Sequence, residues 1–256
     1  MNILLTNDDG IHAIGLHELA NALRKAGYRL FIAAPSVNRS CVSHGLTIGK
    51  PLYADRVVLE GLEDVPSYAI SGTPADCVRL AAGNLFSNID LVISGINQAS
   101  NLGSDSVYSG TVAAAIEGYM IDYPSVAVSK DVFSTDFMTD AAEYTATLIP
   151  NIMKFFKDGA GVLNINFPCM KRSEYRGVRV GDIALQKYTL RYDEEAEEDG
   201  RIAYRIRLGK ITEVAEDEGS DEGFVRDGFV TVTPLTYSFA DKSRMSRARM
   251  IFERDE

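Results

Sequence analysis

The feature that most constrains the fold is the alternation of short apolar runs with segments of helical periodicity along the first two-thirds of the chain. Strands are expected over 2–6, 30–34, 67–71, 90–94, 125–129 and 161–166, and helices over 15–26, 73–85, 111–120 and 136–156. This alternation predicts an α/β fold with a Rossmann-like, mostly parallel, doubly wound sheet. Ligands of such sheets bind in the loops that follow the carboxyl ends of the strands.

After residue 166 the periodicity changes to alternating segments, around 179–182, 202–208 and 229–233. Alternation of this kind predicts a C-terminal extension made of a β-hairpin and a tail. With 256 residues, the chain is long enough for one large α/β domain with appendages. We therefore expect a single domain over 1–256, with 186–222 as an acidic protruding hairpin and 236–256 as a tail.

The formal net charge of −10 is concentrated in one segment. Residues 193–222 hold 12 acidic and 4 basic side chains, which leaves 24 acidic and 22 basic residues elsewhere. A nearly neutral body does not repel a phosphate substrate, whereas the overall charge argues against a nucleic-acid polymer as partner. The first residues show neither a signal-peptide pattern nor a membrane span, so we expect a cytoplasmic protein without membrane attachment.

Two adjacent aspartates, Asp8 and Asp9, follow the first predicted strand directly, and Gly10 lets the backbone turn after them. Carboxylates released from a strand in this way can converge on one hard cation such as Mg²⁺ or Mn²⁺. An ordinary turn would use the same residue types, so this motif alone favours the turn.

Further oxygen-bearing side chains follow two other predicted strands. Ser40 could complete a metal shell, or the neighbouring Arg39 could hold a phosphate, although a solvated loop would contain the same residues. Asn97 could bind the metal through its carbonyl oxygen. The segment Ser109-Gly110-Thr111 enters a helix, where free N–H groups and the helix dipole favour an anion; a simple helix cap is the alternative.

Several motifs occur in one order along the chain: NDDG (7–10), NRSCVS (38–43), GTPADCV (72–78), SGIN (94–97), NLG (101–103) and YSGTVAAAIEG (108–118). Together they resemble the signature of the SurE family of survival-protein nucleotidases. Three positions depart from the family pattern. Cys41 and Ala99 stand where glycines are usual, and Ile14 replaces a common proline, so the shape of the pocket is expected to differ.

The resemblance implies that Asp8, Asp9, Ser40 and Asn97 hold one divalent cation, Mg²⁺ or Mn²⁺, in each subunit. It also implies that Asn101 and the segment Ser109-Gly110-Thr111 line a phosphate pocket. The expected activity is hydrolysis of nucleoside 5′-monophosphates, and of 3′-monophosphates as well, to nucleoside and phosphate. By the same resemblance, the hairpin and the tail are expected to exchange between subunits in a homodimer or homotetramer.

Two chemical routes fit these residues. In the first, the metal activates a water and Asp8 and Asp9 act catalytically by holding that metal. In the second, Asp8 attacks phosphorus itself; that chemistry usually places a second acid two residues on, whereas here the acids are adjacent. A non-catalytic, metal-dependent nucleotide-binding module and a nucleotide-sugar transferase remain the alternatives from other classes.

Overall fold

A computed structural model describes residues 1–131, 134–184, 187–196, 201–212 and 219–253. Within these residues, a nine-stranded sheet has the strand order β3-β4-β2-β1-β5-β6-β7-β11-β8. Its strands are β1 (Asn2–Thr6), β2 (Arg29–Pro35), β3 (Ala54–Val57), β4 (Ser67–Ile70), β5 (Leu91–Asn97), β6 (Ser125–Lys130), β7 (Val162–Phe167), β8 (Val178–Val180) and β11 (Val230–Leu235). Neighbouring strands are parallel except for β3 against β4 and β11 against β7, which confirms the predicted fold class.

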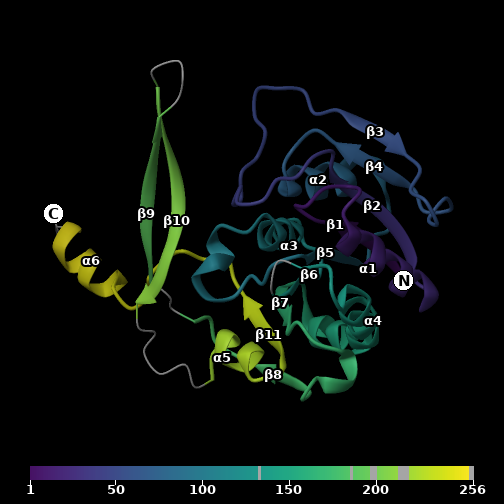
Figure 1. Ribbon diagram of the computed structural model, residues 1–256. Coiled ribbons are helices and arrows are strands. Elements are labelled where there is room, and N and C mark those ends of the chain that lie inside the picture. Colours follow the sequence, from purple (N-terminus) through teal and green to yellow (C-terminus); the bar gives the residue numbers. More distant parts are fainter. Residues whose placement is uncertain (132–133, 185–186, 197–200, 213–218, 254–256) are drawn as a thin grey trace.

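Helices cover both faces of the sheet, with α1 and α4 on one face and α2 and α3 on the other (Figure 1). The α-helices are α1 (Ile14–Lys25), α2 (Pro74–Leu80), α3 (Gly110–Met120), α4 (Met138–Phe155), α5 (Asp221–Arg226) and α6 (Met245–Phe252). The shorter turns are η1 (Ala81–Leu85), η2 (Gly103–Val107), η3 (Phe156–Asp158) and η4 (Arg172–Glu174). No helix of the described ranges combines the length and the apolarity that crossing a bilayer requires.

Strand β1 lies at the centre of the sheet, between β2 and β5. Its side chains alternate between the two faces: Ile3 and Leu5 pack with α1 and α4, whereas Leu4 packs with α2 and α3. All three are fully buried, because a parallel strand covered on both faces has no solvent side. The residues that follow β1 are therefore attached to a strand that is buried on both faces.

Helix α2 begins as its sequence predicts. The Thr73 hydroxyl accepts a hydrogen bond from the Asp76 N–H, and the Asp76 carboxylate accepts one from the Thr73 N–H, which forms a capping box with Pro74 at the first helical position. The regular helix ends at Leu80 rather than near Leu85, and the remainder is the wider turn η1. Strand β5 is longer than expected and continues through Asn97.

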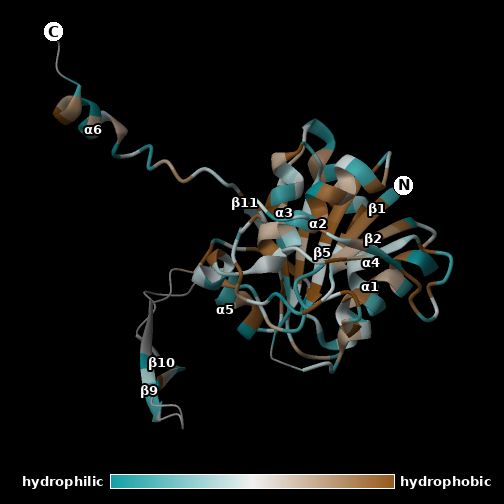
Figure 2. Cartoon of the chain, turned by 90° about the horizontal axis from the view of Figure 1, so that it is seen from above, coloured by the Kyte–Doolittle hydropathy of each residue, from teal (hydrophilic) through white to brown (hydrophobic). Residues whose placement is uncertain are grey.

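Strands β9 (Lys187–Ala196) and β10 (Ile202–Thr212) form a separate antiparallel pair that projects from the body, as does α6 (Figure 2). The tail exposes Phe239 (98%), Met250 (81%) and Phe252 (81%). Phe229, Val230 and Val232 do not add to this exposed apolar surface. Strand β11 buries Val230 and partly covers Val232, and Phe229 lies between the guanidinium groups of Arg176 and Arg179.

Asp221 is fully buried in the body, although it lies in the acid-rich stretch that was expected to be solvated. Its carboxylate accepts hydrogen bonds from the N–H groups of Gly103 (2.9 Å), Ala184 (3.0 Å) and Glu222 (2.9 Å). Burial raises the pKa of Asp221, and these N–H groups oppose the rise. One carboxylate thus ties the loop after β5 to the chain before the hairpin.

The contribution of the Asp221 carboxylate to the free energy of unfolding can be measured. We expect Asp221→Ala to lower the free energy of unfolding by about 2–4 kcal/mol, because three buried N–H groups lose a charged acceptor. Asp227→Ala, which truncates an exposed aspartate at the end of the same helix, should change it by less than about 0.5 kcal/mol. Urea unfolding of both variants checks the difference, and equal effects would contradict the anchoring role.

Candidate active site

The turn after β1 is closed by the side chain of Asn7. Its amide Nδ2 donates to the Gly10 carbonyl (2.9 Å), and its Oδ1 accepts from the Gly10 N–H (3.1 Å). Asn7 is fully buried, and Gly10 has a φ of +108°, a conformation that favours glycine. These contacts fix the backbone of Asp8 and Asp9 at the carboxyl edge of the sheet.

Asp8 lies against the first turn of α3. Its Oδ1 accepts a hydrogen bond from the Thr111 hydroxyl (2.5 Å), and its Oδ2 accepts one from the Thr111 N–H (3.2 Å). A Cβ atom at Gly110 would lie 2.8 Å from the Asp8 Cβ, so only glycine permits this approach. The carboxylate of Asp8 therefore occupies the position that the N-terminus of a helix offers to an anion.

Asp9 faces the loops that follow β2 and β5. The Asn38 amide donates to its Oδ1 (3.3 Å), and the Gln98 N–H donates to its Oδ2 (3.4 Å). The Arg39 N–H also donates to the Asp8 carbonyl (2.7 Å), which brings the loop after β2 against the aspartate turn. Three neighbouring strands thus deliver their following loops to one place, as the parallel topology predicts.

The electrostatics of the pair fit a divalent cation. Burial raises the pKa of Asp8 to about 6; the hydrogen bond from Thr111 lowers it, and the charge of Asp9 raises it further. Burial also raises the pKa of Asp9, and the hydrogen bond from the Gln98 N–H partly opposes this rise. Within the described part of the chain, no lysine, arginine or histidine lies within ion-pair distance of either carboxylate. A cation would compensate this charge.

The other two predicted metal ligands belong to the two segments whose neighbouring residues contact the pair. Asn97 is the last residue of β5, and its Nδ2 donates to the Ala99 carbonyl (2.7 Å), so its Oδ1 is the atom that a metal would contact. Ser40 is exposed and is held next to Asn38, whose Oδ1 accepts from the Ser40 N–H (2.9 Å). The described residues contain no group of three or more His, Cys, Asp and Glu side chains around one point. The donor set is accordingly two carboxylates with neutral oxygens, which Mg²⁺ and Mn²⁺ accept.

The residues predicted to bind phosphate have protein partners. Ser109 caps α3 by accepting from the Val112 N–H (3.1 Å), and Thr111 binds Asp8. Arg39, weighed as a phosphate ligand, donates from its guanidinium to the Ser71 carbonyl (3.0 Å). The first turn of α3 thus orients Asp8, and contact of Ser109, Gly110 or Thr111 with phosphate stays a prediction.

Asn101 lies in a buried network that its sequence position did not reveal. Its Nδ2 donates to the Ser129 hydroxyl (2.7 Å), and its N–H donates to Asn166 Oδ1 (2.8 Å). Its carbonyl accepts from Asn164 (2.8 Å) and Asn166 (3.3 Å). The only sequence signal for this network is the pair of asparagines in the otherwise apolar strand β7. Its contact with phosphate also stays a prediction.

The departures from the family pattern have different consequences. Cys41 is exposed and has a φ of +58°, and Ser43 has a φ of +52°. A left-handed conformation costs a residue with a side chain about 1–2 kcal/mol. Ala99 is not among the described non-glycine residues with positive φ, so it replaces a glycine without this cost. Ile14 begins α1 directly after the extended Ala13.

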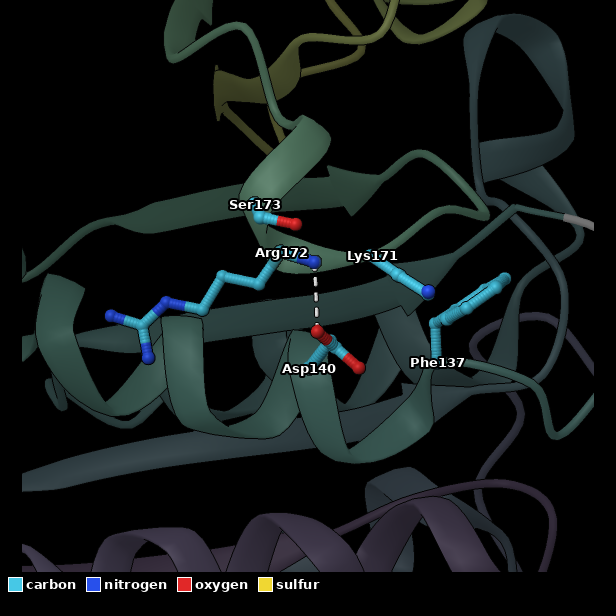
Figure 3. Close-up of a pocket in the computed structure, with 5 residues that line it drawn as sticks. All are labelled: Phe137, Asp140, Lys171, Arg172 and Ser173. Carbon is cyan, nitrogen blue, oxygen red and sulfur yellow. Dashed lines mark hydrogen bonds between the residues drawn. The ribbon is translucent and has the colours of Figure 1, made fainter.

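Two of the larger surface hollows formed by the described residues lie outside the aspartate site. One, of about 590 Å³, lies between the start of α4 and η4; in it the Arg172 N–H donates to Asp140 (2.7 Å; Figure 3). None of its lining residues belongs to the predicted site. The other, of about 680 Å³, follows the outer face of α3 from Ser109 to Met120 and includes Glu117.

The fold and the site define an α/β protein whose parallel sheet carries a carboxylate pair at its carboxyl edge, beside a helix N-terminus. A family model described as "Survival protein SurE" matches residues 3–190. The chain belongs to the SurE family.

Relatives of this family match nearly the whole length of the chain. The 5′-nucleotidase SurE of Clostridium botulinum (strain 657 / Type Ba4) is 39% identical over 98% of this chain and 99% of its own. The 5′-nucleotidase SurE of Syntrophomonas wolfei is 37% identical over 98% of this chain and 95% of its own. The crystal structure of the SurE protein from Aquifex aeolicus superposes with a TM-score of 0.82 at 32% identity, covering 98% of this chain and 99% of that one.

The raised pKa of Asp8 predicts a cost in stability for the metal-free protein. A carboxyl whose pKa rises from 3.8 to about 6 on folding binds its proton more tightly in the folded state. Stability therefore falls as the pH rises from about 4 to 6, by up to about 3 kcal/mol. Asp8→Asn, which can keep both contacts with Thr111, should be more stable than the parent at pH 8 without metal. This advantage should shrink towards zero near pH 4, and urea unfolding at both pH values with a chelator present measures it. An Asp8→Asn variant that is less stable at pH 8 would contradict the assigned burial cost.

Proposed function

We propose that the chain is a metal-dependent 5′-nucleotidase that hydrolyses nucleoside 5′-monophosphates, and 3′-monophosphates as well, to nucleoside and phosphate. The observation that carries the proposal is the pair of carboxylates, buried Asp8 and half-buried Asp9, held where the loops of β1, β2 and β5 meet. The names of the full-length relatives, 5′-nucleotidase SurE, support the reaction class. Asp8, Asp9, Asn97 and Ser40 are the proposed metal ligands.

A bound Mg²⁺ or Mn²⁺ supplies positive charge to a phosphoryl oxygen and lowers the pKa of a bound water. The protein itself orients the two carboxylates. Thr111 holds both oxygens of Asp8, and Asn38 with Gln98 holds those of Asp9, so the carboxylates need little rearrangement. The dipole of α3 adds positive potential on the same side of the site.

The geometry of Asp8 favours a water nucleophile over an aspartyl-phosphate route. Asp8 is 3% exposed, and both of its oxygens accept hydrogen bonds from Thr111. A carboxylate that attacks phosphorus needs one accessible oxygen aligned with the leaving group. Asp8 is therefore assigned as a metal ligand rather than as the attacking group.

Metal-dependent turnover tests the proposal. With millimolar Mg²⁺ or Mn²⁺, the protein should release phosphate from AMP or GMP, and excess EDTA should stop the release. Asp8→Asn removes one negative ligand and should lower kcat/KM by at least about a hundredfold, since metal charge supplies several kcal/mol of the barrier reduction. Asp55→Asn makes the same change on the exposed edge strand β3 and should leave the rate unchanged.

Two outcomes would contradict the proposal. An Asp8→Asn variant as active as the parent would reduce Asp8 to a turn residue. A parent protein that binds AMP with metal but releases no phosphate from any monoester would instead be a nucleotide-binding module.

The exposed tail and hairpin also support a proposed homo-oligomer, a dimer or a tetramer. Phe239, Met250, Ile251 and Phe252 leave an apolar surface that a second copy would cover. Hairpin strands β9 and β10 carry their own ion pairs, Arg205 with Glu195 and Arg207 with Asp193, so the hairpin can keep its shape away from the body.

Light scattering of the full chain at micromolar concentration should give a mass of at least two copies. Deletion of 236–256 should lower this mass, because it removes the exposed apolar tail. A full-length protein with the mass of one 28.0 kDa chain would contradict the oligomer.

A further inference from the structure

Glu117 is a carboxylate in the middle of a helix of small and apolar residues. It lies two turns beyond the start of α3, and its side chain is 1% exposed. Burial of an unpaired charge costs several kcal/mol, so a carboxylate at this position requires specific partners. Its hydrogen bonds go to His44 and Arg79 and not to Asp8 or Asp9.

The two oxygens of Glu117 bind groups from two other parts of the chain. Oε2 accepts from His44 Nε2 (2.7 Å), and Oε1 accepts from Arg79 Nε (2.5 Å) on α2. Burial alone would raise the pKa of Glu117, but the bonds from His44 and Arg79 outweigh it and lower the pKa. Glu117 is thus held as a carboxylate between the loop after β2 and helix α2.

His44 belongs to the same loop as Asn38 and Ser40. Between Ser40 and His44 the chain passes through two left-handed positions, Cys41 and Ser43, neither of which is glycine. Strained conformations of this kind persist only where surrounding contacts hold them. Ser43 is held by the backbone around Tyr108, through its N–H (3.1 Å), and His44 by Glu117.

Both anchors of this segment belong to α3 or to the residues just before it, and α3 also holds Asp8 through Thr111. Asp8 and the segment that carries Ser40 are therefore fixed to a common element. A shift of His44 relative to α3 would move Ser40 relative to Asp8.

We propose that Glu117 is a positioning residue that, through His44, holds segment 40–44 in the strained conformation that presents Ser40 to the aspartate pair. This inference rests on the proposed metal-dependent function. Outer partners that orient metal ligands typically contribute 10–100-fold to metal affinity or activity.

Amide hydrogen exchange of the metal-free protein provides a test that needs no turnover. His44→Ala and Glu117→Ala should speed exchange in 39–43 by about tenfold or more, because local opening of this segment becomes easier, while exchange in β1 stays unchanged. His44→Gln, whose amide nitrogen lies near the position of Nε2, should restore slow exchange. His44→Asn is one carbon shorter and should not restore it.

Calorimetric titration with Mn²⁺ provides the second readout. His44→Ala, His44→Asn and Glu117→Ala should weaken binding by about 10–100-fold, and His44→Gln should bind within about threefold of the parent. Arg79→Ala is the matched control: it removes the other partner of Glu117 and should lower thermal stability, but leave Mn²⁺ affinity and exchange in 39–43 unchanged.

The outcomes separate this inference from the proposed function. If the parent binds Mn²⁺ and His44→Ala binds it equally well, Glu117 has no positioning role and the proposed function stands. If His44→Gln shows the same fast exchange in 39–43 and the same weak Mn²⁺ binding as His44→Asn, the His44 ring acts by packing and the inference is wrong. If the parent binds no Mn²⁺ and releases no phosphate, the proposed function fails first, and a role of Glu117 towards a metal fails with it.

Discussion

The contact between the Asp8 carboxylate and the first turn of α3 is the interaction on which the geometry of the site depends. Asp8 follows the central strand β1, whereas Thr111 lies 103 residues later along the chain. Gly110 allows this approach because any side chain there would collide with Asp8. The contact fixes the direction of the carboxylate, and it places the positive end of the helix on the side where negative charge collects.

The negative charge of Asp8 and Asp9 lowers the stability of the metal-free protein and favours the binding of a cation. Folding buries Asp8 and half-buries Asp9 without a basic partner among the described residues, and both pKa values rise in consequence. A cation bound to the two carboxylates would restore this stability, since a ligand that binds only the folded state stabilises it. Under the proposed function, the carboxylates would therefore link the stability of the protein to the supply of metal.

The sequence predicts the fold from local patterns, because strand alternation, the cap at Thr73 and the glycine after Asp9 each act within a few residues. It also places Asp8, Asp9 and Asn97 at one edge of the sheet. It does not reveal Asp221 as an anchor, because an acidic run normally indicates a solvated segment. The partners of Asn101 in its buried network and those of the Glu117 carboxylate lie between 28 and 73 residues away along the chain, so only tertiary packing brings them together. For the same reason, the sequence does not reveal that Thr111 binds Asp8, and contact of Thr111 with phosphate stays a prediction.

The anchoring of Gly103 by Asp221 has a consequence for the order in which the protein is completed during synthesis. Translation is slow compared with the formation of local structure, so the N-terminal part of a chain can organise first. All of the proposed ligands lie before residue 112. Their strands can assemble while the hairpin and the tail are still in the ribosomal exit tunnel or not yet synthesised. The loop that carries Asn101, however, lacks its carboxylate anchor until residue 221 has emerged. A nascent chain can thus bring its proposed metal ligands together early. The loop that carries Asn101 is anchored only later, when the segments proposed to join two copies also emerge.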